Sequence, residues 1–437
     1  MASETWVFAP LRDFVTFING DRSTNYPSTE DNDSRGLPFV SATELINGKL
    51  EIDRVRRISE VAYDRLDSGK FAANDVLFCL RGSVGKLAPV PDGLLGAVAS
   101  SLVIVRANII DPHFLLYLMS SPEFQRAVRT RDNGSVQGNV SVKELGQLPV
   151  RVPDAKEQKA IVASLSPLDE RIGLISLQNR VLEAIARGIF KSWFVDFDPV
   201  RAKVEGREPE GMDAATAALF PCKFQDSTLG SIPICWKIGR VCDLGAVICG
   251  KTPPTAVRDY YGDEVPFITI PDMNGRVFAH ETTRRLSVQG AEFQRSKYLP
   301  PRSICVSCIA TVGLVTLTSE RSQTNQQINS VVPNQEFPSC FSFFILRNLG
   351  EEIRSAGSGG SVFGNLNKSR FESLTVLLPP PSLAHAYSSL VTPLFDKILL
   401  NLRVRGTLTE LRDTLLPRLI SGKLRVPEAE KLVEAVI

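Results

Sequence analysis

The stretch GSVQGNVSVKELGQLPVRVP, residues 134–153, returns as GSVFGNLNKSRFESLTVLLP at residues 360–379. The two stretches lie 226 residues apart, and this spacing continues downstream without a gap, where it joins Pro167 to Pro393. Upstream the spacing becomes 228 and then 230 residues, where it joins Gly20 to Gly250. An ordered series of matches along the whole chain indicates a tandem duplication. Further identical pairs are Trp6/Trp236, Pro38/Pro266, Gly85/Gly313, Asn139/Asn365, Leu182/Leu408 and Leu148/Leu374.

Each copy begins with a region that we expect to mix helices and strands. Residues 71–90 alternate short apolar runs with Gly and Pro, which is typical of strands and turns. The apolar segments 102–106 and 330–332 predict one strand in each copy. Asp111 followed by Pro112 is a helix-start signal and predicts a helix to Met119. Its counterpart in the second copy is expected to start at Pro338.

Each copy ends in a long amphipathic segment. Ser166-Pro167 and Thr392-Pro393 resemble helix starts, with a hydroxyl N-cap and proline at the first helical position. Apolar residues then recur at steps of three and four, which is nearly the heptad pattern of a coiled coil, until Pro417 interrupts the second series. From Pro167 to Trp193 such a helix would be about 40 Å long. The two helices could pair antiparallel as a spacer, or they could be ordinary core helices.

The predicted fold is therefore a mixed α/β protein, a tandem duplication of two α/β domains separated by two long antiparallel, coiled-coil-like spacer helices. The segment from Asp196 to Gly211 is rich in charge, Pro and Gly, which indicates a linker. The predicted boundaries are 1–153 for domain 1, 154–195 for the first helix region, 196–228 for the linker, 229–379 for domain 2, 380–426 for the second helix region and 427–437 for a C-terminal tail.

The composition excludes several classes of protein. With 50 Lys and Arg against 48 Asp and Glu the net charge is +2, so any nucleic-acid surface must be local. The chain has no apolar run of about 18 residues and no secretory signal at its N-terminus, so we expect a cytoplasmic protein. Eight unevenly spaced cysteines indicate reduced thiols, and three distant histidines argue against a multi-histidine metal site.

No motif predicts catalysis or a bound cofactor. The turn from Arg81 to Lys86 lacks the spacing and the final Ser/Thr of a phosphate-binding loop. Asp154 and Glu157 are too close in sequence for a metal-dependent nuclease, and the second copy lacks them. Cys305-Val-Ser-Cys308 resembles half of a zinc site, but the repeat aligns these cysteines with leucines of the first copy. We therefore expect them to be buried on a strand.

Basic and amide side chains gather where the two copies differ or turn. Arg and Lys can bind guanine, and Asn and Gln can bind adenine, each through hydrogen bonds in the major groove. Such clusters are also common on solvated surfaces. The candidate DNA-binding residues are Arg54, Arg56, Arg57, Arg81, Ser83, Lys86, Asn139, Lys251, Thr252, Asn325, Gln326, Gln327, Asn365 and Lys368.

The whole chain resembles the specificity (S) subunit of type I restriction–modification systems. The resemblance rests on the Gly-Ser-Val-x-Gly-Asn segments, on residues 75–78 and 81–86, on residues 38–40 and 266–268, and on Trp236 with residues 244–253. It implies that each domain is a target recognition domain that reads one half of a split DNA sequence. It also implies that the helices set the separation and bind two methyltransferase subunits, while motor-nuclease subunits join that core. The expected partner-binding residues are Leu168, Ile172, Ile175, Leu182, Ile185, Ile189, Leu394, Ile398, Leu408, Leu411 and Leu415.

The same resemblance implies no catalysis in this chain, with S-adenosylmethionine, ATP and Mg²⁺ held only by partner subunits. The second copy departs from the pattern at residues 309–313, where the Gly-rich turn has neither Arg nor Lys, which puts a phosphate contact there in doubt. Successive major-groove faces lie about 34 Å apart, a spacing that a helix pair of about 40 Å can hold. A metal-dependent nuclease and a DNA-free protein scaffold remain the alternatives.

Overall fold

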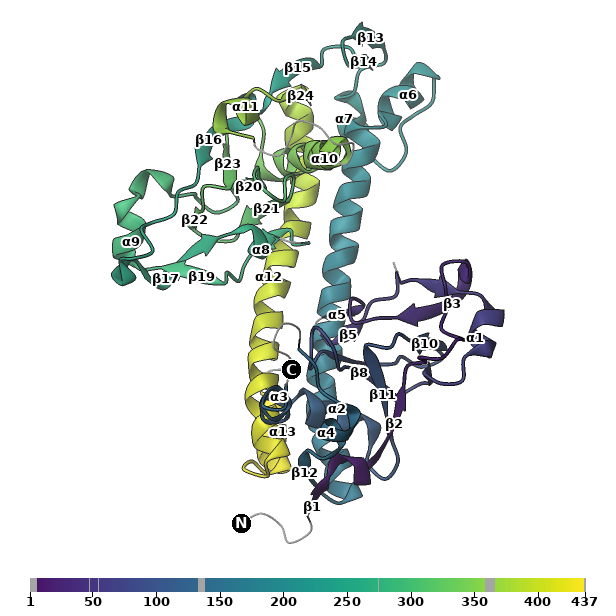
Figure 1. Cartoon of the computed structure of the whole chain (residues 1–437). Helices are drawn as coiled ribbons and strands as arrows, with labels where there is room; N and C mark the ends of the chain where they lie inside the picture. The colour runs from purple at the N-terminus through teal and green to yellow at the C-terminus, as the bar shows by residue number, and fades with distance from the viewer. Residues whose placement is uncertain are drawn as a thin grey trace. The chain divides into compact units, whose positions relative to one another are not determined.

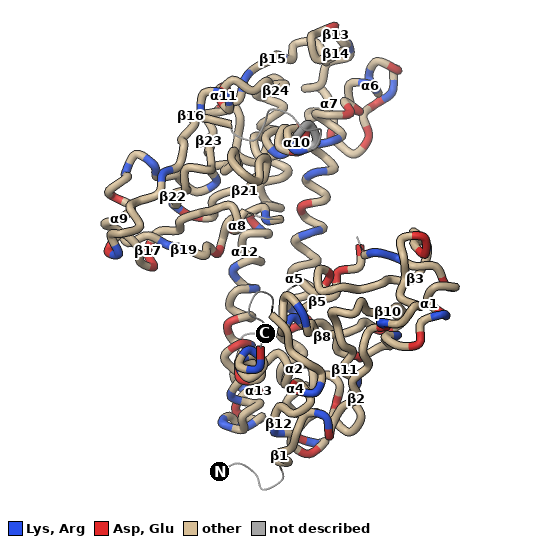
Figure 2. The backbone as a smooth tube through the Cα atoms, in the orientation of Figure 1, with Lys and Arg blue, Asp and Glu red and all other residues tan. Residues whose placement is uncertain are grey.

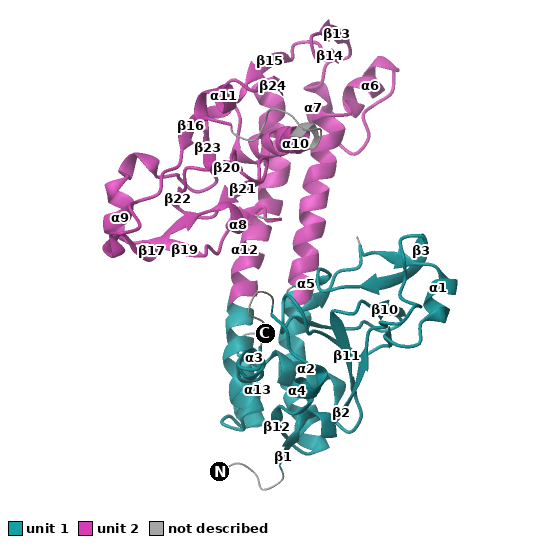
Figure 3. Ribbon diagram, in the orientation of Figure 1, with its two compact units in different colours: residues 1–172, 407–437 teal, residues 173–406 magenta. Residues whose placement is uncertain are grey.

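The computed structural model describes residues 6–46, 48–53, 55–132, 138–273, 275–357 and 366–435. It divides into two compact units, residues 1–172 with 407–437 and residues 173–406 (Figure 3). The division passes through both long helices, α5 (Ala155–Phe194) and α12 (Pro381–Ile420) (Figure 1). Each unit therefore combines one α/β domain with the first part of that domain's own helix and the last part of the other copy's helix.

Domain 1 is built on two four-stranded sheets, with strand orders β6-β3-β10-β7 and β2-β11-β8-β9. Strands β1 and β12 pair separately, and so do β4 and β5. The predicted strand at 102–106 and the predicted helix after Asp111 are both present, and Asp111 caps that helix by accepting from the backbone N–H groups of His113 and Phe114. The elements are β1 (Val7–Pro10), β2 (Val15–Asn19), β3 (Asn32–Val40), β4 (Leu45–Ile46), β5 (Lys49–Leu50), β6 (Arg57–Ile58), α1 (Glu60–Arg65), β7 (Lys70–Phe71), β8 (Val76–Cys79), β9 (Leu87–Pro89), β10 (Gly96–Val98), β11 (Leu102–Ala107), α2 (Pro112–Ser120), α3 (Pro122–Arg129), α4 (Val142–Gly146) and β12 (Pro149–Val152).

Domain 2 repeats this plan. Its sheets have the orders β16-β23-β20-β21-β18 and β19-β17-β22, and β15 pairs with β24 as β1 pairs with β12. Cys305 lies on β20 and Cys308 follows it, and both are buried, as the repeat predicts. The elements are β15 (Lys237–Arg240), β16 (Gly245–Cys249), β17 (Tyr261–Ile268), α8 (Ile270–Met273), β18 (Phe278–Ala279), β19 (Arg284–Leu286), α9 (Val288–Phe293), β20 (Ile304–Ser307), β21 (Val315–Thr318), β22 (Gln323–Thr324), β23 (Ile328–Pro333), α10 (Ser339–Gly357), α11 (Lys368–Glu372) and β24 (Thr375–Leu378).

The two long helices do not begin at Ser166-Pro167 and Thr392-Pro393, the segments that resemble helix starts. Helix α5 begins at Ala155 and α12 at Pro381, so Pro167 and Pro393 lie inside helices, and Pro417 does not end α12. Asp154 caps α5 by accepting from the backbone N–H of Glu157 at 2.8 Å. A proline inside a helix costs about 3 kcal/mol. Burial on the turns that precede each proline offsets this cost, because the side chains of Ile161, Leu165, Leu383, Tyr387 and Val391 are almost fully buried.

The expected linker is partly packed against unit 2. It contains α6 (Asp198–Val204), α7 (Ala214–Ala218) and β13 (Phe224–Ser227), which forms a hairpin with β14 (Gly230–Pro233) just after the predicted linker. Val200 and Phe220 belong to the hydrophobic core of unit 2, and the ring of Phe220 meets that of Trp193 edge-on at 5.1 Å. The segment therefore extends the core as well as joining the two copies.

Within unit 2 the two long helices run antiparallel. Tyr387 of α12 donates a hydrogen bond to the carbonyl oxygen of Ala186 at 2.9 Å, and Asn401 donates to the side chains of Gln178 and Asn179, both at 2.8 Å. Residue numbers thus rise along α5 as they fall along α12. Burial raises the pKa of Tyr387, so its hydroxyl stays a donor. The antiparallel pairing predicted from the sequence is confirmed.

Domain 2 is fixed to the helix pair of its unit by an aromatic core. Phe190 of α5 lies 5.4 Å from Phe344 of α10 and 5.7 Å from Tyr387 of α12, ring centre to ring centre. Ion pairs join the same helices, with Arg187 at 2.9 Å from Glu351 and Arg347 beside Glu183. Helix α10 therefore attaches domain 2 to the C-terminal part of α5.

Unit 1 uses a polar contact at the corresponding place. Asp169 of α5 accepts from the hydroxyl of Tyr117 on α2 at 2.6 Å and from Arg412 of α12 at 2.9 Å. Burial, helped by the neighbouring Asp169 carboxylate, raises the pKa of Tyr117, so the tyrosine remains protonated. The C-terminal helix α13 (Val426–Glu434) also belongs to unit 1. No helix in the described part of the chain is long and apolar enough to cross a membrane.

We expect Arg106→Ala to destabilise domain 1 by about 2–4 kcal/mol, because it leaves a buried carboxylate without its charged partner. Asp75 is 2% exposed and accepts from Arg106 at 2.7 and 2.8 Å. Calorimetry of the chain would measure the loss. Arg12→Ala is the matched control, since the Arg12–Asp13 pair is exposed and spans 3.7 Å, and should change stability by under about 1 kcal/mol. Equal effects of the two changes would contradict this account.

Candidate nucleic-acid interface

Five of the candidate residues of domain 2, residues 251–252 and 325–327, lie together where β16 ends. The backbone N–H of Lys251 donates to the carbonyl oxygen of Thr324 at 2.9 Å, and the hydroxyl of Thr252 donates to Oε1 of Gln326 at 2.5 Å. Gly250 permits this approach, because a Cβ atom there would lie 2.1 Å from the carbonyl oxygen of Asn325. The sequence therefore places a lysine, a threonine and a glutamine on one exposed edge.

The neighbouring amides hold one another in place. Asn325 donates to Oε1 of Gln327 at 2.9 Å and accepts from the backbone N–H of Gln327 at 3.2 Å. The carbonyl oxygen of Gln327 accepts from the backbone N–H of Cys308 at 2.8 Å, which joins this edge to the turn between β20 and β21. Gln326 remains exposed, so it and Lys251 are the side chains best placed to meet a ligand. We call residues 250–252 and 324–327 the domain 2 edge.

Domain 1 has the same edge with different side chains. Gly20 occupies the place of Gly250, since a Cβ atom there would lie 2.7 Å from the carbonyl oxygen of Ala99. Arg22, aligned with Thr252, donates to the carbonyl oxygen of Ser100 at 3.2 Å. Beside it Asp21 accepts from the backbone N–H groups of Ser23 and Asp67. Burial would raise the pKa of Asp21, but these hydrogen bonds outweigh burial and lower it.

Arg22 was missed by the search for basic clusters. It is exposed and is a single arginine in a polar loop, so no cluster marks it. The spacing of 230 residues that aligns Gly20 with Gly250 also aligns Arg22 with Thr252. The repeat alone could therefore have found it, and we add Arg22 to the candidates.

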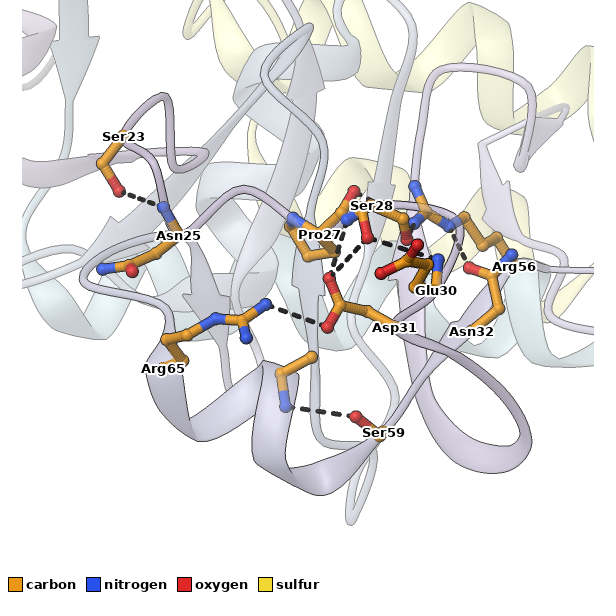
Figure 4. Close-up of polar contacts among 11 residues, drawn as sticks. Ser23, Asn25, Pro27, Ser28, Glu30, Asp31, Asn32, Arg56, Ser59 and Arg65 are labelled. Atoms are coloured by element: carbon orange, nitrogen blue, oxygen red, sulfur yellow. Dashed lines mark hydrogen bonds and ion pairs between the residues drawn. The ribbon is translucent and has the colours of Figure 1, made fainter.

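The predicted arginines at and just before β6, Arg57 and Arg56, bond to their own domain. Arg56 donates to Oδ1 of Asn32 at 2.7 Å and to the carbonyl oxygens of Pro27 and Ser28 (Figure 4). Arg57 donates to the carbonyl oxygen of Gly36 at 2.9 Å. Both guanidinium groups thus hold loops of domain 1 together. Arg54 lies outside the described residues, and so does Asn365 of domain 2.

The Gly-rich turn of domain 1 is open to solvent. Arg81, Ser83 and Lys86 are exposed, and none has a side-chain ion pair within the described residues. Arg81 bridges to Asn139 through the backbone, and the N–H of Gly82 donates to the carbonyl oxygen of Gly138 at 2.9 Å. The structure therefore brings Asn139 to this turn. In domain 2 Lys368 instead lies 3.4 Å from Glu372 of its own helix, α11.

Charge is spread over both units. Lys and Arg alternate with Asp and Glu along the backbone (Figure 2). Within the described residues no three His, Cys, Asp or Glu side chains are grouped to hold a metal ion. Asp154 and Glu157, the residues that resemble a nuclease motif, are both engaged, since Asp154 caps α5 and Glu157 accepts from the indole N–H of Trp6 at 2.8 Å.

The domain 2 edge and its counterpart in domain 1 recur within one chain, and comparisons with known proteins also find one family domain twice. The family described as "Type I restriction modification DNA specificity domain" matches residues 3–184 and again residues 233–402. The chain belongs to this family. It is 35% identical to the type I restriction enzyme HindI specificity subunit of Haemophilus influenzae, over 95% of this chain and 100% of that protein. It is 24% identical to the MjaIX specificity subunit of Methanocaldococcus jannaschii, over 97% and 94% of the two chains.

A solved structure supports the fold. The type I restriction–modification S subunit from M. genitalium aligns with a TM-score of 0.56 at 15% identity, covering 96% of this chain and 97% of that one. The duplicated α/β domains with long helices are therefore the fold of the specificity-subunit family. The role of the family, DNA sequence specificity, applies to this chain, and the catalytic and DNA-free alternatives are not supported.

Most predicted partner-binding residues of the specificity-subunit helices are covered by the chain itself. The side chains of Leu168, Ile175, Ile398, Leu408 and Leu415 are buried. Leu182, Ile189 and Leu394 pack against the core of unit 2, and Ile172 and Leu411 are half-buried. Of the predicted set, Ile185 is the most exposed, at 46%.

A different apolar stripe of α5 is exposed. Leu174, Leu177, Val181 and Ile185 are 61%, 50%, 49% and 46% exposed, at steps that place them on one face of the helix. On α12 Leu400 is 51% exposed, and the repeat aligns it with Leu174. Exposed apolar stripes of this kind mark interaction surfaces. We call Leu174, Leu177, Val181 and Ile185 the α5 stripe.

Proposed function

We propose that this specificity subunit reads a split DNA sequence, with the edge of domain 1 on one half and the edge of domain 2 on the other. The single observation that carries the proposal is the recurrence of one close backbone approach, Gly20 to Ala99 and Gly250 to Asn325, beside different side chains, Arg22 in domain 1 and Thr252 with Gln326 in domain 2. A shared framework fits the same groove twice, whereas different side chains select different bases. The two half-sites should therefore be unequal.

The long helices serve as spacer and as docking site in this proposal. Each helix has 40 residues, hence about 60 Å of length. The α5 stripe and the aligned Leu400 would each receive one methyltransferase subunit, which makes two copies. Motor-nuclease subunits would join that core. Catalysis, S-adenosylmethionine, ATP and Mg²⁺ then belong to the partners, and the complex works on DNA in the cytoplasm.

Methylome sequencing of a host with and without this gene tests the proposal directly. We expect methylated adenines in one split motif that disappears with the gene. A gel shift of the purified complex on that motif, compared with a scrambled duplex, supplies the binding measurement. Unchanged methylation in the deletion strain, together with no sequence preference in the gel shift, would contradict the proposal.

Lengthening the helix pair should lengthen the unread gap. We expect four residues inserted after Ile175, with four more after Val404, to add about 6 Å of helix. Val404 of α12 lies opposite Ile175 of α5. The side chain of Asn401 bonds Gln178, and in an antiparallel pair three residues back along α5 correspond to three residues forward along α12. At about 3.4 Å for each base pair the gap should grow by one or two positions, with both half-sites unchanged. The methylome of the insertion strain measures it.

The control for this prediction is the insertion in α5 alone. It shifts one helix against the other and should lower the yield of folded chain, because Asn401 is 3% exposed and would lose its partners. An active complex with the paired insertion and an unchanged gap would show that the helices do not set the spacing.

A further inference from the structure

Helix α1 of domain 1 and helix α9 of domain 2 are held by the same backbone contact but end in different side chains. Ser59 caps α1 and Ser287 caps α9, and each serine donates its backbone N–H to the carbonyl oxygen of one loop residue, Asp31 at 2.9 Å and Tyr260 at 3.1 Å. Each helix has six residues and ends at Arg65 or Phe293. Asp31 with Arg65 therefore corresponds to Tyr260 with Phe293.

The chemistry at this shared position is opposite in the two domains. In domain 1 Arg65 forms an ion pair with Asp31 at 2.9 Å (Figure 4). In domain 2 the rings of Tyr260 and Phe293 stack with centroids 4.9 Å apart. Phe293 is 48% exposed, so half of an apolar ring faces solvent although the position accommodates charged side chains in the other domain.

The aromatic pair borders the domain 2 edge. The ammonium group of Lys251 lies 5.3 Å from the ring centre of Phe293. Gln294, the next residue, donates to the carbonyl oxygen of Lys251 at 2.9 Å and to Oε1 of Gln323 at 2.7 Å. Both contacts fix the ring against the residues that carry the candidate hydrogen-bonding groups. Phe293 therefore belongs to the same surface as Lys251 and Gln326.

The charges around the ring favour a polyanion. The side chains of Lys251 and Arg258 are exposed, and neither has an ion pair within the described part of domain 2. Lys297 is half-buried and likewise has no carboxylate partner there. The acidic residues next to the ring pair in sequence are the exposed Asp259 and Glu292, and Glu292 lies 3.8 Å from Arg295. A duplex could thus approach with its phosphates beside these cations.

We propose that Phe293, supported by Tyr260, is a specificity-determining residue of domain 2 that contacts the 5-methyl group of a thymine in the major groove. This proposal rests on the proposed function. A phenylalanine ring offers no hydrogen bond to a base edge, and the thymine methyl is the apolar group that the major groove presents. At the same position of domain 1 Arg65 with Asp31 selects a different, hydrogen-bonding base edge. The two half-sites then differ at this position.

The test replaces thymine by uracil, which lacks the methyl group. The purified complex with its methyltransferase binds duplexes in which each thymine of the domain 2 half-site is changed in turn. At one position uracil should weaken binding by the wild-type complex about fourfold, the value for one buried methyl group. Phe293→Ala should bind thymine and uracil duplexes equally at that position. Val288→Ala, at the other end of α9 and 58% exposed, is the control and should keep the fourfold difference.

A second variant separates loss of contact from loss of folding. Tyr260→Asp with Phe293→Arg places the domain 1 pair on the domain 2 framework, which domain 1 shows to be compatible with that pair. Its methylome should change at this one position of the domain 2 half-site and nowhere else. A uracil effect that persists in Phe293→Ala, or no thymine-sensitive position in the wild type, overturns the inference. A wild-type complex without any sequence preference overturns the proposed function instead.

Discussion

Replacing residues 229–379 with the corresponding segment of a relative of different specificity is expected to change one half of the methylated motif completely and leave the other half intact. The two ends of the domain lie together, because β15 pairs with β24, with Lys237 opposite Leu378, and the segment starts in the turn of the β13–β14 hairpin. The domain 2 edge lies wholly inside the segment. Methylome sequencing of the exchange strain measures the result.

The chimaera must keep the contacts by which α10 packs on α5. Phe341 and Phe344 of α10 pack on Phe190 of α5, and Arg347 with Glu351 of α10 pairs with carboxylate and guanidinium groups of α5. A donor without these four residues would lose the aromatic contacts, each worth about 1 kcal/mol beyond its buried area. The four residues should therefore be retained in the chimaera.

The reciprocal exchange of residues 1–153 is the control for this prediction and should change the other half of the motif. Together the two chimaeras assign each half-site to one domain. If either exchange altered both halves of the motif, the two domains would not recognise their half-sites independently. The shared backbone contacts would then reflect the duplication alone and not a shared role in DNA recognition.

The duplication could be predicted from the sequence because identical residues return at a nearly constant spacing. Many of these residues have structural reasons to be kept. Gly20 and Gly250 admit a neighbouring backbone at 2.7 and 2.1 Å from a would-be Cβ atom, and Trp6 bonds Glu157. The same logic found the α2 helix, whose Asp-Pro start is a local signal. A helix start that depends on neighbouring residues, and a glycine that recurs in both copies, can be recognised in the sequence itself.

The helix starts could not be predicted in the same way. Ser166-Pro167 has the residues of a helix start, yet the first helical residue is Ala155, twelve residues before Pro167. The deciding contacts are tertiary, since Gln158 is 4% exposed and accepts from the backbone N–H of Asp111, 47 residues away. Tertiary burial therefore outweighs the local preference of Ser166-Pro167 for a helix start, and the spacing of residues within the helix does not reveal that burial.

Periodicity also failed to separate covered from exposed faces of the helices. Leu168 and Ile175 recur at the same steps of three and four as Leu177 and Val181, but the first pair is buried and the second exposed. Apolar residues occur on more than one face of α5, and the faces differ only in what packs on them. The recurrence of apolar residues alone therefore does not show which face of α5 is exposed.

The α5 stripe gives the second large expected effect. We expect Leu177→Glu with Val181→Glu to release the methyltransferase that docks on α5, so that the purified complex retains one of its two methyltransferases, and to lower adenine methylation at least about 100-fold. Two carboxylates in a buried apolar interface each cost several kcal/mol, and about 2.7 kcal/mol already gives a 100-fold loss of affinity. Because these side chains are 50% and 49% exposed, the chain itself should fold normally. Pull-down of the tagged subunit with its co-expressed methyltransferase is the measurement.

Arg180→Glu is the matched control, since it changes charge on the same helix at an exposed position beside the stripe and should leave the complex intact. Leu400→Glu on α12 distinguishes one docking site from two. If the aligned leucines Leu174 and Leu400 each serve one methyltransferase, Leu400→Glu should retain one of the two subunits, so the mass of the complex falls by one methyltransferase. A complex of full mass with the Leu177→Glu, Val181→Glu chain would place methyltransferase binding on another surface of the subunit.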